Sequence, residues 1–102
     1  MNKLLMTLLA IVLFSANSFA QNGTLNGRVV STDNTPLESV TITINGTRFG
    51  TQTGTDGKFE IQNIKPGDYV LKVAFVGYTS KEVLFTITEN TTTTLENISL
   101  NS

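Results

Sequence analysis

Apolar and polar side chains alternate along most of the chain after residue 20, which is the period of a β-strand with one buried face. The clearest run is Tyr69–Val76, where Tyr69, Leu71, Val73 and Phe75 share one face. The same alternation predicts short strands over residues 25–30, 40–44, 59–61 and 81–88, with a short, irregular edge strand over 48–53 and a last strand over 92–100. No segment after residue 20 has the 3.6-residue apolar period of a helix.

Turn-forming residues separate these strands. Asp56-Gly57 predicts a tight hairpin turn with two positive φ angles. Pro66-Gly67 predicts a type II turn, because proline fixes φ near −65° and glycine accepts a positive φ. Gly77 ends the run from Tyr69 before the next strand begins. We interpret these residues as a structural turn motif that connects a meander of half-buried antiparallel strands.

The alternation of apolar residues shifts by one position within the last predicted strand. Ile98 and Leu100 lie on one face, whereas Leu95 falls on the other, which predicts a bulge or a register change within residues 92–100. About seven short strands with frequent turns are typical of an all-β fold, a seven-stranded antiparallel β-sandwich.

The first twenty residues have the pattern of a signal peptide. Lys3 precedes an apolar run from Leu4 to Phe14, and small residues at Ser18 and Ala20 predict cleavage between Ala20 and Gln21. The run has eleven residues, and a membrane-spanning helix needs about 20. We therefore expect a signal peptide over 1–20 and one domain over 21–102.

Composition narrows the chemistry that this domain can perform. The chain has no His, Cys or Trp, so it has neither the usual ligands of a zinc site nor an imidazole base for a serine nucleophile. Asp56 is explained by turn chemistry, and alternation places Glu60 on the solvent face opposite Phe59. Seven Lys and Arg against eight Asp and Glu, with no basic cluster, exclude a nucleic-acid footprint. We expect no catalytic residue, cofactor or metal.

An ordered set of motifs resembles one family. The set comprises Gly27-x-Val29, Val40-x-Ile42-x-Ile44-x-Gly46-Thr47, Thr55-Asp56-Gly57-x-Phe59-x-Ile61, Ile64-x-Pro66-Gly67-x-Tyr69-x-Leu71 and Gly77-Tyr78. It resembles the carboxypeptidase-regulatory-like domain over Gly23 to Leu100. The resemblance implies a transthyretin-like (prealbumin-like) sandwich.

This version of the domain is similar to the N-terminal extension of outer-membrane TonB-dependent receptors from Bacteroidetes-type bacteria. That similarity implies export to the periplasm or outer membrane of a Gram-negative bacterium. It also implies a non-catalytic role with a protein partner: the receptor's plug and barrel, the TonB system or an associated lipoprotein. The chain ends at Ser102, where the stretch before the plug is expected, so we expect either a truncated receptor, joined to a membrane only through a missing barrel, or a free-standing domain.

Three residues are candidates for contact with a partner. Arg48 and Phe49 lie in a Gly/Thr-rich loop, and Tyr78 follows Gly77 in the turn between two predicted strands. A free-standing carbohydrate- or protein-binding module is the alternative function. A carbohydrate site requires an aromatic platform, and in a chain without Trp its only candidate members are Phe49 and Tyr78.

Overall fold

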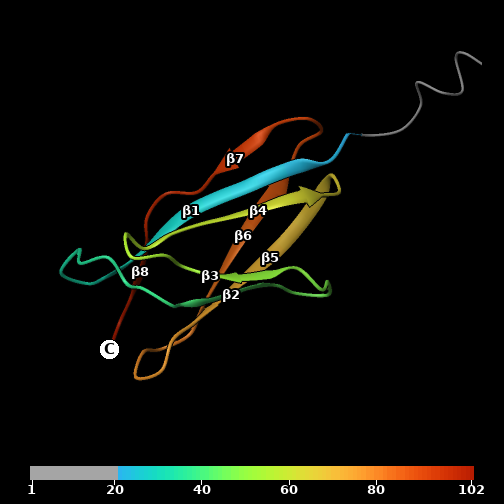
Figure 1. The fold of residues 1–102 in the computed structure, drawn as a ribbon. Helices are drawn as coiled ribbons and strands as arrows, with labels where there is room; N and C mark the ends of the chain where they lie inside the picture. The colour runs from blue at the N-terminus through green and yellow to red at the C-terminus, as the bar shows by residue number, and fades with distance from the viewer. Residues whose placement is uncertain (1–20) are drawn as a thin grey trace, which may run out of the picture.

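The computed structural model describes residues 21–102, so the signal peptide and its cleavage after Ala20 lie outside the described residues and stay predictions. Eight strands make up the domain (Figure 1). They are β1 (Gly23–Ser31), β2 (Thr41–Ile44), β3 (Gly50–Gln52), β4 (Lys58–Ile64), β5 (Gly67–Ala74), β6 (Lys81–Ile87), β7 (Thr92–Thr94) and β8 (Ile98–Leu100).

The strands form two four-stranded sheets. In the first sheet β1 is central, with β4 on one side and β7 followed by β8 on the other. The second sheet has the order β3-β2-β5-β6, so β3 and β6 are its edges. The predicted all-β sandwich is confirmed, and its strand number rises to eight because the expected last strand is divided into β7 and β8.

The break between β7 and β8 is the register change that Leu95 predicted. Thr94 lies opposite Asn26, whereas Ile98 lies opposite Val29, so one extra residue is accommodated between the two pairings. The Leu95 N–H donates to the Asn26 carbonyl at 2.9 Å.

The pairing of β7 and β8 with β1 is parallel, which corrects the expectation of a purely antiparallel sandwich. The chain leaves β6 and crosses to the first sheet at the end where β1 begins, as the hydrogen bond from Thr24 N–H to the Thr91 carbonyl at 3.1 Å records. Strands β1 and β7 therefore start at the same end of the sheet and run in the same direction.

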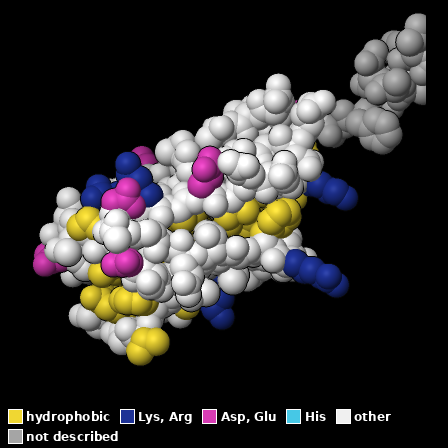
Figure 2. Space-filling view, in the orientation of Figure 1, with side chains coloured by type: hydrophobic (Ala, Val, Ile, Leu, Met, Phe, Trp, Pro, Cys, Tyr) yellow, Lys and Arg dark blue, Asp and Glu magenta, His cyan; other side chains and the backbone are white. Residues whose placement is uncertain are grey.

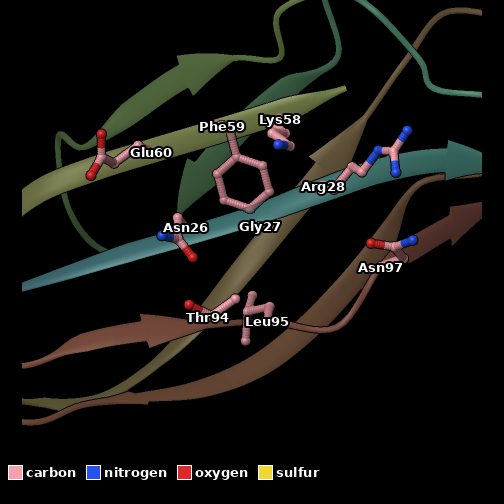
Figure 3. Close-up of a pocket in the computed structure, with 9 residues that line it drawn as sticks. All are labelled: Asn26, Gly27, Arg28, Lys58, Phe59, Glu60, Thr94, Leu95 and Asn97. Carbon is pink, nitrogen blue, oxygen red and sulfur yellow. The ribbon is translucent and has the colours of Figure 1, made fainter. Parts of the chain in front are cut away.

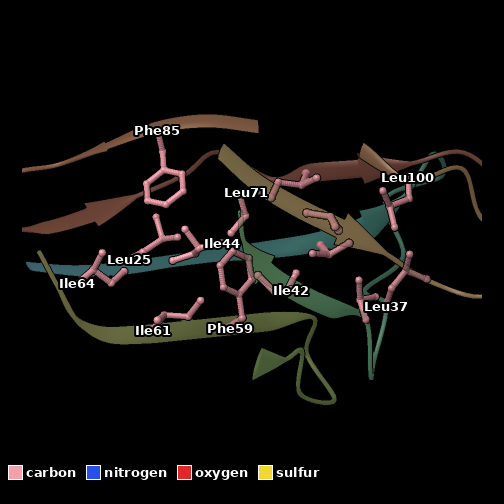
Figure 4. Close-up of a cluster of buried hydrophobic side chains, with 14 of the residues drawn as sticks. Leu25, Leu37, Ile42, Ile44, Phe59, Ile61, Ile64, Leu71, Phe85 and Leu100 are labelled. Carbon is pink, nitrogen blue, oxygen red and sulfur yellow. The ribbon is translucent and has the colours of Figure 1, made fainter. Parts of the chain in front are cut away.

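A single apolar core fills the space between the sheets (Figure 4). Each sheet supplies alternate residues, such as Leu25 from β1 and Leu71 from β5, and both are fully buried. The members are Leu25, Val29, Leu37, Val40, Ile42, Ile44, Phe59, Ile61, Ile64, Leu71, Val73, Phe85, Ile87, Ile98 and Leu100. Among the described residues this core extends from residue 25 to residue 100, so we expect residues 21–102 to fold on their own.

The turn at Asp56-Gly57 differs from the expected hairpin in two respects. It joins β3 to β4, which belong to different sheets, and only Gly57 has a positive φ, at +78°. The Gly57 N–H donates to the Gly54 carbonyl at 2.9 Å, and the Asp56 carboxylate accepts the Lys58 N–H at 3.1 Å. Asp56 therefore holds the turn as a hydrogen-bond acceptor while Gly57 supplies the left-handed conformation.

The connection through Pro66-Gly67 also crosses between the sheets, from β4 to β5. Gly67 has a φ of +153° and is the first residue of β5, which differs from the φ near +80° of a type II turn. The Tyr69 hydroxyl donates to the Lys65 carbonyl at 2.6 Å, so a side chain closes this corner. The expected meander is therefore wrong for β3, β4 and β5, because consecutive strands alternate between the two sheets.

Candidate functional site

The residues expected to contact a partner lie at opposite ends of the second sheet. Arg48 and Phe49 are in the β2–β3 loop, beyond the pairing of Ile44 with Leu71. Tyr78 is in the β5–β6 loop, which follows the other end of the same pairing (Figure 1). Phe49 is half-buried and packs against the core. The structure therefore does not bring Phe49 and Tyr78 together into one aromatic platform.

The β5–β6 loop forms an apolar tip. Tyr78 packs on Phe75 with ring centroids 5.4 Å apart, and Val76 between them is 94% exposed. Gly77 has a φ of +88° and turns the chain. The Thr79 N–H donates to the Asn101 carbonyl at 2.8 Å, which ties the loop to the end of the domain. Figure 2 shows apolar side chains gathered at the lower left, where Figure 1 places this loop.

A cleft of about 680 Å³ lies beside β1 and β4 (Figure 3). Its floor is Gly27, which has no side chain, and the Phe59 ring lies across this position. A Cβ on Gly27 would approach the Phe59 Cζ to 2.8 Å, so the glycine is required for the ring to lie there. Its other lining residues are polar or charged apart from Leu95: Asn26, Arg28, Lys58, Glu60, Thr94 and Asn97.

Two cations face each other at one end of this cleft. Arg28 on β1 is the direct partner of Lys58 on β4, and like charges in this position repel. The Arg28 Nε–H donates to the Asp56 carbonyl at 3.0 Å, which turns the guanidinium toward the β3–β4 turn. The cleft offers hydrogen-bonding groups but no nucleophile with an adjacent base.

A second groove, of about 530 Å³, separates β6 from the break between β7 and β8. Its walls are Lys81, Glu82, Val83 and Leu84 on one side and Leu95, Glu96, Asn97 and Ile98 on the other. Leu84 is 80% exposed. The alternation pattern did not predict this groove, although it held one signal: Leu84 is apolar on the polar face of an otherwise alternating strand.

An exposed turn after β1 contains a carboxylate with a shifted pKa, Asp33. The Ser31 hydroxyl donates to the Asp33 carboxylate and is the main cause of a lowered Asp33 pKa. This pattern is that of a turn held by its own side chains. Residues 21–102 contain no group of three or more His, Cys, Asp or Glu that could hold a metal, and no helix among them is long and apolar enough to cross a membrane.

Comparison with known proteins connects this domain to receptors. The chain is similar to the TonB-dependent receptor SusC of Bacteroides thetaiotaomicron, with 36% identity over 83 residues, which is 81% of this chain. It is also similar to the TonB-dependent receptor P39 of Formosa agariphila, with 30% identity over 70 residues, or 69% of this chain. The chain spans only 8% and 7% of the lengths of these two relatives.

A solved structure supports the fold alone. The minor pilin GBS52 of Streptococcus agalactiae superposes with a TM-score of 0.66 at 24% identity, over 81% of this chain and 45% of the pilin. At the level of sequence, residues 25–102 match the CarboxypepD_reg-like domain. That match covers most of the chain, including every core position of both sheets. The chain therefore belongs to the carboxypeptidase-regulatory-like domain family.

Proposed function

We propose that this chain is a non-catalytic accessory module of a TonB-dependent outer-membrane transporter, acting in the periplasm by contact with a protein partner. The observation that carries the proposal is the 36% identity to SusC over 81% of this chain but only 8% of that receptor. A similarity of this extent concerns one domain of a much longer protein. The candidate partners are the receptor's own plug and barrel, TonB, or a lipoprotein associated with the receptor.

Interaction explains the surface better than catalysis does. The larger cleft contains Arg28, Lys58 and a single carboxylate, Glu60, rather than a pair of carboxylates, and the chain has neither His nor Cys. A sugar site would need an exposed aromatic face, yet Phe59 in the cleft is only 5% exposed. These features support a protein-binding module over the free-standing carbohydrate-binding alternative.

Reading the gene beyond the Ser102 codon tests the first part of this proposal. We expect a plug followed by segments of about ten residues with alternating apolar side chains, which is the sequence signature of a transmembrane barrel. Removing residues 21–102 from that receptor should reduce uptake or signalling while the barrel still inserts in the outer membrane. A stop codon after Ser102 in an intact genome, with no barrel gene nearby, would contradict the proposal.

A glycan array provides the opposing test. The purified domain should give no signal above background, and Phe49→Ala should change nothing. A clear glycan ligand that is lost on Phe49→Ala would favour the carbohydrate-binding module.

A further inference from the structure

Within residues 21–102, strand β6 pairs with β5 alone, so its other edge has no strand partner among them. The Thr93 hydroxyl donates to the Thr86 carbonyl at 3.0 Å, so this carbonyl points away from β5. In an antiparallel strand, alternate residues direct their backbone N–H and C=O to the same side. The backbone groups of Leu84 and Glu82, two and four residues earlier, therefore also point outward from the sheet. They form a short row of donors and acceptors beside the groove.

The side chains along this edge suit an extended apolar strand. Leu84 is 80% exposed on the outer face of the sheet. On the inner face, half-buried Val83 lines the groove opposite Leu95 and Ile98. A strand added to β6 would place alternate side chains against Leu84 and into the groove, because successive side chains point to opposite faces.

The edge has only part of the protection usual for such strands, namely the charged Lys81 and Glu82 at one end and the Thr93 hydroxyl on the Thr86 carbonyl at the other. The seven residues of β6 include no proline, and their pairing with β5 runs without a register shift. Lys81 is the one lysine on the strand, and its Nζ donates to the Ser99 carbonyl at 3.4 Å across the groove. The middle of the edge, at Leu84, has no such protection, and an exposed leucine there makes it a site where another strand can pair.

Charge along the groove indicates which strand fits. Glu82 and Glu96 line it as carboxylates, while the ammonium of Lys81 is turned to the Ser99 carbonyl. We propose that β6 binds an extended peptide segment of a protein partner, antiparallel to β6, with apolar residues opposite Val83 and Leu84 and a Lys or Arg opposite Glu82. This inference rests on the proposed interaction function and adds to it the surface and the chemistry of the partner.

A synthetic peptide tests the inference directly. The sequence Ser-Thr-Val-Val-Val-Lys-Ser places its central valine opposite Leu84 and its lysine opposite Glu82. Fluorescence anisotropy of the labelled peptide with residues 21–102 measures affinity, and amide NMR locates the contact. At about 1 mM peptide, the weak end of specific recognition, we expect the amide signals of β6 to shift. Replacing the central valine by proline should abolish these shifts, because proline cannot donate a backbone hydrogen bond.

Two variants separate the backbone contribution from the charge contribution. Leu84→Pro removes the outward N–H and should weaken binding at least about tenfold, the effect of losing one or two hydrogen bonds. Glu82→Lys should weaken binding roughly two- to fivefold, as expected for an exposed ion pair, and should favour a peptide with Glu in place of Lys. Glu60→Lys, the same charge reversal on exposed β4, is the matched control and should leave affinity unchanged. If Leu84→Pro fails to fold, the Glu82→Lys charge swap still decides.

Three results would overturn the inference: no shift on β6, equal affinity for the proline-containing peptide, or a dimer of the domain with β6 at its interface. The last would make a second copy the occupant of this edge. If the peptide does not bind, the result of the receptor deletion experiment is not affected. If the deletion has no effect on uptake or signalling, the result of the peptide titration is not affected. The two proposals can therefore fail separately.

Discussion

Replacing Thr53 with valine removes the one buried polar side chain that the structure describes in residues 21–102. Thr53 follows β3 and is 4% exposed. Its hydroxyl donates to the Leu37 carbonyl at 2.6 Å and accepts the Val40 N–H at 3.0 Å. Two backbone bonds add to these: Thr53 N–H to the Val40 carbonyl at 3.1 Å, and Ser39 N–H to the Thr53 carbonyl at 2.9 Å. Thr53 thus fixes residues 37–40 against the core.

The loss in free energy of unfolding on Thr53→Val can be estimated from these contacts. Valine has nearly the same shape, so Thr53→Val leaves the backbone bonds in place but strips partners from the Leu37 carbonyl and the Val40 N–H. Each orphaned buried group costs about 1–3 kcal/mol, and the added methyl returns about 1 kcal/mol. With two orphaned groups, we expect the free energy of unfolding to fall by about 1–5 kcal/mol. That is a large share of the roughly 4–12 kcal/mol expected for 82 residues.

Urea unfolding followed by far-UV circular dichroism measures this loss, since the chain has no Trp for fluorescence. The midpoint should move to lower urea with an unchanged slope. Thr51→Val is the matched control, because Thr51 lies in β3 and is only half-buried, so water can serve its hydroxyl. A change below about 0.5 kcal/mol in Thr53→Val, the size typical of surface substitutions, would refute the assigned role of the hydroxyl.

Three further predictions use other parts of the chain. Gly57→Ala should lower the unfolding free energy well beyond Gly46→Ala: both glycines have a φ near +77°, but only at Gly57 would a Cβ meet a backbone atom, the Val29 carbonyl oxygen at 2.5 Å. Equal losses in urea would contradict this. Because the Asp33 pKa is lowered from its ordinary value of 3.8, the ionised carboxylate stabilises the fold above pH 3.8, and this contribution is lost as the pH falls through the pKa of the folded state. In Asp33→Asn, the free energy of unfolding should therefore depend less on pH below 3.8. Intact mass of exported protein should show Gln21 as the first residue, and a retained signal segment would refute the cleavage prediction.

Local periodicity was enough to predict most strands. The alternation through Leu71 and Val73 gives β5 its buried face, and the shift of the alternation at Leu95 gives the break between β7 and β8. Both signals depend only on which side chains must be buried along one strand. Leu84 on β6 departs from the same alternation, because it is an apolar residue on the exposed face, and it lies beside the groove.

Strand partners could not be predicted in the same way. The residues of a turn such as Asp56-Gly57 determine the local backbone, but the partner of the following strand depends on contacts distant in sequence. Here β4 pairs with β1 in the first sheet rather than with β3 in the second, and the approach of Gly57 to the Val29 carbonyl comes from that pairing. The separation of Phe49 from Tyr78 has the same origin, because their loops lie at opposite ends of β2 and β5.

The amino-acid composition of this domain explains why it would bind a partner through its backbone. A chain without His, Cys or Trp has few groups that bind a ligand strongly through one side chain, and its apolar residues are largely used in the core. Main-chain N–H and C=O groups at a sheet edge are available in any sequence, and a strand that pairs with them gains affinity without a specialised residue. Selectivity then comes from alternate pockets and a few charges, here Leu84, the groove beside Val83, and Glu82. Such a surface can keep its function while most exposed side chains vary.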